Sequence, residues 1–182
     1  MKIPVLFVHA RSNYKKLDTF DCYDEKRNAL SFTGSLPVIV HPPCRLFSRL
    51  RGMSCAPPEE KELAYWAVDL VRKNGGVLEH PVGSTLWKDK NLPLPGQYDE
   101  FGGFTICINQ SWFGYYAEKR TLLYIVGIKM GDLPGYPLSF DAVQKMVPQL
   151  TKKQRSETTV ELCMYLAEII KKIGFTGVLS AV

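Results

Sequence analysis

The sequence has no feature that indicates a disulfide framework, a zinc ribbon or a membrane span. Its five cysteines form no Cys-x-x-Cys pair and are widely scattered, at Cys22, Cys44, Cys55, Cys107 and Cys163. An odd, dispersed set of this kind is typical of a reduced compartment. No apolar run approaches the roughly 18 residues that a membrane helix needs. We therefore expect a cytoplasmic protein with no membrane contact.

Internal repeats and low-complexity segments are also absent, so nothing divides the 182-residue chain. Hydrophobic residues make up 46% and charged residues 23%, which is the balance of a globular protein. The net charge of +5 is compatible with a nucleotide or nucleic-acid partner but is also common on small domains. We expect a single α/β domain over residues 1–182.

Short apolar runs rich in β-branched and aromatic residues predict the strands. They cover residues 3–8, 20–23, 37–40, 76–78, 104–108 and 122–128. A helix should begin near Pro58 and end at Asn74, and a second should run from Ser156 to Lys172. Strand, helix and strand at this spacing form a βαβ unit. The pattern predicts a small Rossmann-like, mostly parallel sheet with flanking helices.

Two irregular stretches suggest binding elements. Residues 87–103 are rich in Pro and Gly, which is typical of a lid or binding loop but also of an ordinary surface excursion. Residues 151–174 combine a basic turn with the second helix, whose N-terminus is a candidate anion site. Ser156 as a simple N-cap accounts for that turn equally well.

Cys44 follows the strand 37–40 in the segment His41-Pro42-Pro43-Cys44. Open α/β sheets bind their ligands at the carboxyl ends of strands, which is where this thiol should lie. Nearby positive charge favours a thiolate, and three arginines are close in sequence, namely Arg45, Arg49 and Arg51. Cys44 is therefore a candidate nucleophile, with a buried and inert cysteine as the alternative.

Glu79 emerges from the next predicted strand in the segment Leu78-Glu79-His80-Pro81. Parallel strands joined by a helix usually lie near one another, so we expect Glu79 to come within reach of Cys44. A nucleophile beside a carboxylate that holds or supplies a proton is a catalytic pair. The alternative is a structural carboxylate that caps the following turn.

These segments resemble motifs of the cytosine-C5 DNA methyltransferases. Pro42-Pro43-Cys44 with Phe47-Ser48, and then Glu79 after a helix and a strand, are similar to that family's Pro-Pro-Cys-x-x-Phe-Ser and Glu-Asn-Val motifs. A third block is similar to its Tyr-Gly, Gln-x-Arg-x-Arg and Ile-Val-Gly elements, in Phe113-Gly114, Glu118-Lys119-Arg120 and Leu123 to Gly127. The match covers roughly residues 20 to 128. The overall pattern also resembles short proteins of phages and prophages.

The resemblance implies roles for particular residues in a methyltransferase-like DNA modification. Cys44 would attack C6 of a pyrimidine as thiolate, Glu79 would hydrogen-bond the ring N3 and exocyclic group, and Arg120 would bind near the thiol or pyrimidine O2. The implied cofactor is S-adenosylmethionine, with its ribose at the end of the second strand, near Asp21 and Asp24. Further substrate-binding candidates are His41, Arg45, Ser48, His80 and Lys119.

Three departures from the family pattern affect these expectations. The Gly-rich first motif is replaced by Phe7-Val8-His9-Ala10, His80 stands in place of the Asn of Glu-Asn-Val, and there is no room between Gly127 and Gln154 for the large domain that reads duplex sequence. These departures argue against S-adenosylmethionine and against site-specific modification. They leave open a non-catalytic nucleotide-binding or phage counter-defence protein that keeps the pocket.

The three histidines and the basic residues also bear on the ligand. His9, His41 and His80 each follow a predicted strand, and three imidazoles can hold zinc. Phosphate binding or simple hydrogen bonding explains them as well, and we expect no metal. Basic residues with interleaved aromatic residues at the same edge predict a nucleotide or nucleic-acid partner, although a solvated basic surface is the alternative. They include Arg11, Lys15, Lys16, Lys119, Tyr14, Trp112 and Tyr115.

Overall fold

The computed structural model describes residues 1–48, 51–137, 145 and 149–179, with the backbone alone for 152, 153 and 175–179. These residues form one six-stranded sheet in the order β2-β1-β3-β4-β6-β5. The strands are β1 (Ile3–Val8), β2 (Phe20–Asp24), β3 (Val38–Val40), β4 (Gly76–Pro81), β5 (Phe104–Asn109) and β6 (Arg120–Val126). Each predicted strand is present, so the prediction of an α/β fold is confirmed.

The sheet is mostly parallel but mixed. Strands β2, β1, β3 and β4 are parallel to one another, whereas β6 runs antiparallel to both β4 and β5. A parallel pair needs a long crossover, and the short connection between β5 and β6 favours an antiparallel pair instead. Strand β2 lies on one side of β1, and the chain then crosses back so that β3 lies on the other side of β1. The strand order therefore reverses at β1 and β3, which is where open α/β sheets bind ligands.

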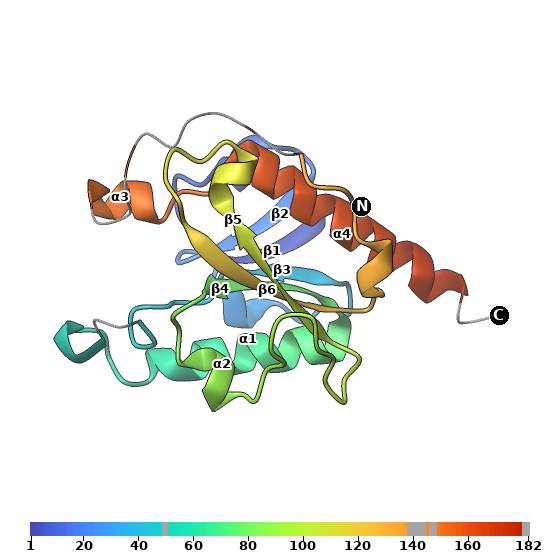
Figure 1. The fold of residues 1–182 in the computed structure, drawn as a ribbon, viewed down its shortest axis with the longest axis horizontal. Coiled ribbons are helices and arrows are strands. Elements are labelled where there is room, and N and C mark those ends of the chain that lie inside the picture. Colours follow the sequence, from blue (N-terminus) through green and yellow to red (C-terminus); the bar gives the residue numbers. More distant parts are fainter. Residues whose placement is uncertain (49–50, 138–144, 146–148, 180–182) are drawn as a thin grey trace.

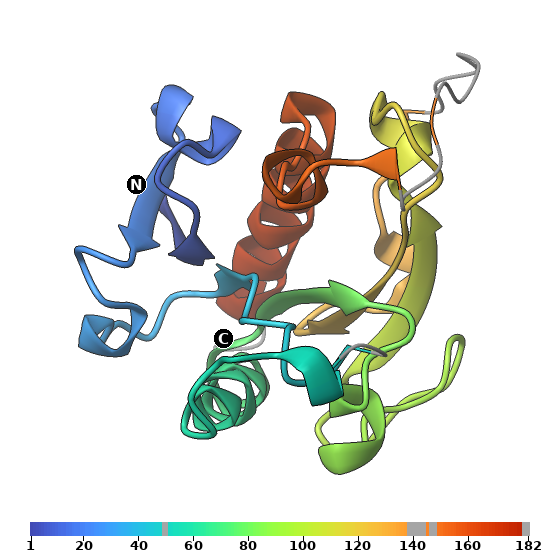
Figure 2. The same cartoon turned by 90° about the vertical axis from the view of Figure 1, so that its left-hand side faces the viewer.

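Helices α1 (Glu60–Asn74) and α4 (Val160–Leu179) cover opposite faces of the sheet (Figures 1 and 2). Successive strand residues point to opposite faces. Val5 and Val77 accordingly pack in the cluster that contains α4, while Leu6 and Leu78 pack in the cluster that contains α1. The sheet is thus buried on both faces, which accounts for the uninterrupted apolar runs of its strands.

The helix boundaries differ in part from the sequence predictions. Helix α1 ends at Asn74 as predicted, and the next strand starts at Gly76, where an added Cβ would collide with the Val38 carbonyl. Helix α4 begins at Val160 rather than Ser156. Its cap is Thr159, whose Oγ1 accepts the Leu162 N–H at 3.3 Å. The basic turn before it forms the one-turn helix α3 (Lys152–Arg155).

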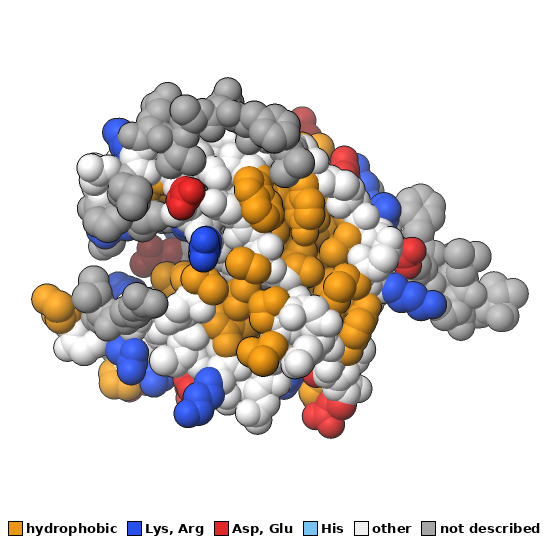
Figure 3. Space-filling model, viewed as in Figure 1, with side chains coloured by type: hydrophobic (Ala, Val, Ile, Leu, Met, Phe, Trp, Pro, Cys, Tyr) orange, Lys and Arg blue, Asp and Glu red, His pale blue; other side chains and the backbone are white. Residues whose placement is uncertain are grey.

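The Pro- and Gly-rich stretch 87–103 packs along the edge of the sheet formed by β5, near the start of that strand. It begins within the short helix α2 (Leu86–Asp89), and bridges join Pro95 to Thr105 and Tyr98 to Phe104. These contacts shield part of the edge strand β5, beside which apolar side chains gather on the molecular surface (Figure 3). None of the described helices is long and apolar enough to cross a membrane.

Candidate functional site

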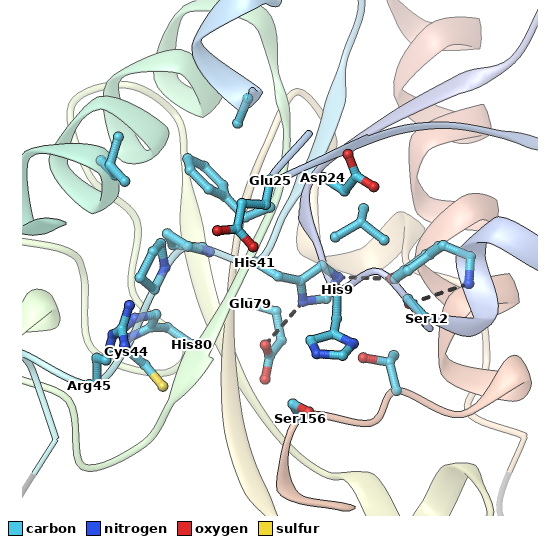
Figure 4. Close-up of a pocket in the computed structure, with 18 of the residues that line it drawn as sticks. His9, Ser12, Asp24, Glu25, His41, Cys44, Arg45, Glu79, His80 and Ser156 are labelled. Atoms are coloured by element: carbon cyan, nitrogen blue, oxygen red, sulfur yellow. Dashed lines mark hydrogen bonds and ion pairs between the residues drawn. The ribbon is translucent and has the colours of Figure 1, made fainter. Parts of the chain in front are cut away.

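A cavity of about 650 Å³ opens at the carboxyl ends of the four parallel strands. Each strand places side chains in its wall, because parallel strands all end at the same edge of the sheet. His9 follows β1, Asp24 ends β2, His41 follows β3 and Glu79 lies near the end of β4 (Figure 4). Lys119 and the segment 155–158 close the cavity from the second half of the chain. Residues 87–103 do not line it, so the structure gives them no lid role there.

The carboxylate of Glu79 accepts hydrogen bonds from three side chains. Gln110 Nε2 donates to Oε1 at 3.2 Å, and the Thr121 hydroxyl also contacts Oε1. His41 Nδ1 lies 3.1 Å from Oε2. Thr121 shares the face of Glu79 because it lies two residues from Leu123, the residue that pairs with Glu79 across β4 and β6. The predicted carboxylate is therefore fixed in place by β6 and by the segments that follow β3 and β5.

This environment keeps Glu79 ionised. Burial by itself raises the pKa of the carboxyl group, but the hydrogen bonds and charges of His41, Lys119 and Thr121 outweigh burial and hold the pKa at about 2. The side chain is only 13% exposed. Glu79 is thus a hydrogen-bond acceptor at neutral pH and has no proton to donate.

His41 connects Glu79 to a buried tyrosine. Its Nε2 lies 2.9 Å from the Tyr14 hydroxyl, and its Nδ1 is occupied by Glu79. Tyr14 is 1% exposed, and burial raises its pKa well above the ordinary value. Because both ring nitrogens are engaged, His41 orients Glu79 instead of offering a free nitrogen to a ligand.

Cys44 lies at the rim of the same cavity, and its side chain is exposed (Figure 4). Protein atoms around the thiol still exclude water, so burial raises its pKa, and the charge of Glu79 raises it further, whereas Lys119 lowers it. The thiol pKa is raised overall, contrary to the expectation that the neighbouring arginines favour the thiolate, and Arg49, one of the three, lies outside the described residues. The guanidinium of Arg45 instead binds the carboxylate of Glu60, with Nε at 2.7 Å from Oε1.

Lys119, rather than Arg120, supplies the cation in the site. Its backbone N–H donates to Asn109 Oδ1 at 3.1 Å, and its Nζ donates to the Arg155 carbonyl at 2.9 Å. The ammonium charge lowers the pKa of both Cys44 and Glu79. Arg120 is exposed at the start of β6 and does not line the cavity, because alternation along the strand turns it away.

His80 contributes to the cavity wall but packs in the core. Its ring lies 5.7 Å from the Phe47 ring and 6.3 Å from the Trp87 ring, both in edge-on contact. Neither nitrogen makes a well-formed hydrogen bond with the described residues, although the Pro43 carbonyl is near enough to favour the protonated ring. Burial lowers its pKa to about 4, which the charge of Glu79 and the Pro43 carbonyl only partly offset.

Three other predicted site residues are bound by other groups of the protein. Asp21 pairs with Arg27 outside the cavity. Asp24 lines the cavity but is bound by Lys15 and by two backbone N–H groups at 3.0 Å, which belong to residues 26 and 27. Ser48 donates to the Arg45 carbonyl at 3.3 Å and does not line the cavity.

These contacts do not fit the implied S-adenosylmethionine site. The acids proposed for its ribose are engaged by the protein's own cations. Near the end of β1, at a shift in strand register, Phe7 has a positive φ of 62°, and His9 and Ala10 follow the strand where the family has glycines. A non-glycine residue with that conformation is strained, so this turn differs from a glycine-rich loop in kind.

Sequence reasoning missed Gln110 and Thr121 as site residues and did not place Tyr14 against His41. Gln110 and Thr121 are polar residues at the ends of apolar strands, and both are buried. Buried polar side chains in such positions need a partner, which is the signal that points to Glu79.

The three-histidine alternative gains no support from the structure. His80 faces the core, and His41 is bound to Glu79 and Tyr14. Among the residues that the structure describes, no group of three or more His, Cys, Asp or Glu side chains could hold a metal ion. Comparison with known proteins found no matching family model and no curated protein of similar sequence.

Proposed function

We propose that this cavity binds a pyrimidine, in a nucleotide or in unpaired nucleic acid, and that Cys44 adds to C6 of the ring. The observation that carries the proposal is the convergence of Cys44, Glu79 and Lys119 on one cavity. They come from three segments far apart in the sequence, which are the segments that resemble the cytosine-C5 methyltransferases. The location at the reversal of strand order supports a ligand site.

The Rossmann-like character of the fold belongs to the same proposal. Four neighbouring strands are parallel, α1 connects β3 to β4 as a βαβ unit, and helices lie on both faces. These features support a small nucleotide-binding domain whose site lies at the carboxyl ends of its parallel strands.

The addition step follows from the chemistry of the three groups. The Cys44 proton passes to solvent, and the thiolate sulfur forms a bond to C6. The C5–C6 π electrons move onto C5, where they are delocalised into the conjugated group at C4. A solvent proton then adds at C5. Loss of a C5 proton and elimination of the thiolate then restore the ring. Lys119 stabilises the thiolate and the negative charge that develops on the ring.

Methyl transfer is not part of this proposal. S-adenosylmethionine is the donor that the resemblance implies, but Asp21 and Asp24 are bound by other residues of the chain. Titration calorimetry with S-adenosylmethionine tests that ligand directly.

The test of the addition step needs no cofactor, because addition and elimination exchange the C5 hydrogen with solvent. Pyrimidine nucleotides incubated in D₂O should lose the C5 proton signal in NMR spectra when the protein is present. Cys44→Ser should abolish the exchange, whereas Cys107→Ser, which removes another exposed cysteine, should not. Equal exchange by the Cys44→Ser protein would refute the role of the thiol.

A second candidate is a non-catalytic nucleotide-binding protein with the same pocket. The observation in its favour is the raised pKa of Cys44, which keeps most of the thiol protonated at neutral pH. Nucleotide binding without C5 exchange, unchanged in the Cys44→Ser variant, would establish this candidate over the first.

A further inference from the structure

A second cavity of about 1210 Å³ opens at the other edge of the sheet, where the parallel strands begin. Ile3 starts β1, Pro37 precedes β3 and Gly75 precedes β4, and all three residues line this cavity. The first residues of the chain and the second half of α4 also flank it (Figure 1). It shares no lining residue with the cavity at the carboxyl ends of the strands. A ligand bound here would therefore be separate from a ligand of the first cavity.

The apolar wall of the second cavity is mainly aliphatic. Its side chains come from the sheet, from the segment before β3 and from α4, and they include Leu36, Val126, Ile128, Ile170 and Ile173. Phe101 is the one aromatic residue among the described residues that line it, and the Arg72 guanidinium lies over its ring at 4.3 Å from the centroid. Sites that bind a base without reading its sequence stack it on aromatic side chains. This wall instead offers burial to an aliphatic chain.

Positive charge surrounds the same cavity. Four exposed lysines line it, and they belong to different parts of the fold, namely Lys2, Lys73, Lys129 and Lys171. None of the four forms a salt bridge with a described residue. Arg72 also lines the cavity, but its guanidinium lies 3.7 Å from the carboxylate of Asp99. Asp132 is the one carboxylate among the described lining residues, so the lysines are not neutralised by the wall itself.

The position of the lysines favours a negatively charged group. Like charges around one opening repel one another, and an anion between them relieves that repulsion. Lys73 lies in the last turn of α1, where it complements the negative end of the helix dipole. The other three lysines lie before β1, after β6 and within α4, so the dipole of α1 does not account for the set.

We propose that the second cavity binds a medium-chain aliphatic carboxylate, with the chain against the apolar wall and the carboxylate among the lysines. Small-molecule sites combine a mostly apolar wall with a few polar groups that orient the ligand, which is the arrangement found here. The volume lies above the roughly 300–1,000 Å³ of ordinary sites, so it does not limit a chain of this kind. The apolar residues line a cavity and do not form one face of a surface helix, which favours a single dissolved molecule over a bilayer.

Titration calorimetry of the full chain with sodium decanoate, below the concentration at which it forms micelles, tests this proposal. Decanoate should bind with one-to-one stoichiometry and about tenfold more tightly than octanoate, because two further methylene groups are buried. Decyltrimethylammonium has a chain of the same length but a positive head group, and it should bind much more weakly. In NMR spectra, decanoate should shift the amide signals of Gly127 and Lys129, which line the second cavity, and leave that of Cys44 unchanged.

The double variant Lys73→Gln, Lys129→Gln should bind decanoate about fivefold more weakly, because it removes two cations from the wall. Lys88→Gln removes an exposed lysine that lines neither cavity and should bind like the unaltered protein. Equal affinity for decanoate and decyltrimethylammonium, or an equal effect of the double variant and Lys88→Gln, would overturn the proposal. Failure to bind decanoate would also overturn it, and binding to anionic phospholipid vesicles alone would assign this surface to a membrane instead. Each of these results leaves the pyrimidine site of the first cavity unaffected.

Discussion

Acid should remove a contribution that Glu79 makes to the stability of the fold. Burial raises the pKa of this carboxyl group, but His41, Lys119 and Thr121 more than compensate and lower it from the usual 4.5 to about 2. A group with a depressed pKa stabilises the fold fully above its unfolded value and loses that stabilisation as the pH falls through its folded value. At about 1.4 kcal/mol for each tenfold change in proton affinity, the contribution of Glu79 is roughly 3 kcal/mol.

Urea unfolding followed by tryptophan fluorescence measures this contribution between about pH 6 and about pH 2.5. The informative quantity is the change in unfolding free energy with pH, compared between the unaltered protein and Glu79→Gln. Other carboxyl groups titrate in both proteins and cancel, whereas residue 79 titrates in only one. The unaltered protein should lose up to roughly 3 kcal/mol more over this range.

The matched control is Glu25→Gln, which removes one negative charge from an exposed position in the same cavity. It separates a general effect of net charge from the effect of the Glu79 hydrogen bonds. Parallel pH dependence in the unaltered protein and in Glu79→Gln would refute the reasoning.

Two further variants test the surroundings of Glu79. Because burial and the charge of Glu79 raise the pKa of Cys44 above its ordinary 9.0, alkylation of Cys44 by iodoacetamide should still accelerate beyond that pH. Lys119→Met should move the pH dependence of Cys44 alkylation to higher pH, and Glu79→Gln should move it to lower pH. Mass spectrometry of the labelled peptides measures the rates, and unchanged curves would contradict the assigned charges. Replacing His80 by Leu should raise the free energy of unfolding by about 1–2 kcal/mol, because it removes a buried imidazole that makes no well-formed hydrogen bond with the described residues. Urea unfolding provides the value, and a loss of stability would show that the imidazole makes an important polar contact.

The strands and helix α1 were predictable because their signals are local. The run from Ile3 to Val8 is apolar enough to be buried on both faces, and Pro58 and Gly75 delimit α1 by the backbone conformations they favour. The inward face of α1 depends on its packing. Ala64 and Val68 are buried at its centre, because a helix close to a sheet leaves room for small side chains.

The proximity of Cys44 and Glu79 was also predictable, because parallel strands joined by one helix place their carboxyl ends together. The reversed direction of β6 was not predicted from its apolar residues, which look the same in either orientation. That reversal brings Thr121 and Lys119 to the site and turns Arg120 away. A difference of one residue along the strand decides which side chain reaches the cavity, because successive side chains lie on opposite faces.

The sequence by itself determined which residues form strands and that a cysteine and a carboxylate meet at one sheet edge. Tertiary structure alone decided the chemical state of those groups. Arg45 is neutralised by Glu60, the thiol pKa is raised instead of lowered, and the carboxylate is held ionised by donors from distant segments. The reason is physical: strand formation depends on neighbouring residues, whereas a pKa depends on every charge, donor and excluded water within a few ångströms, wherever it lies in the chain.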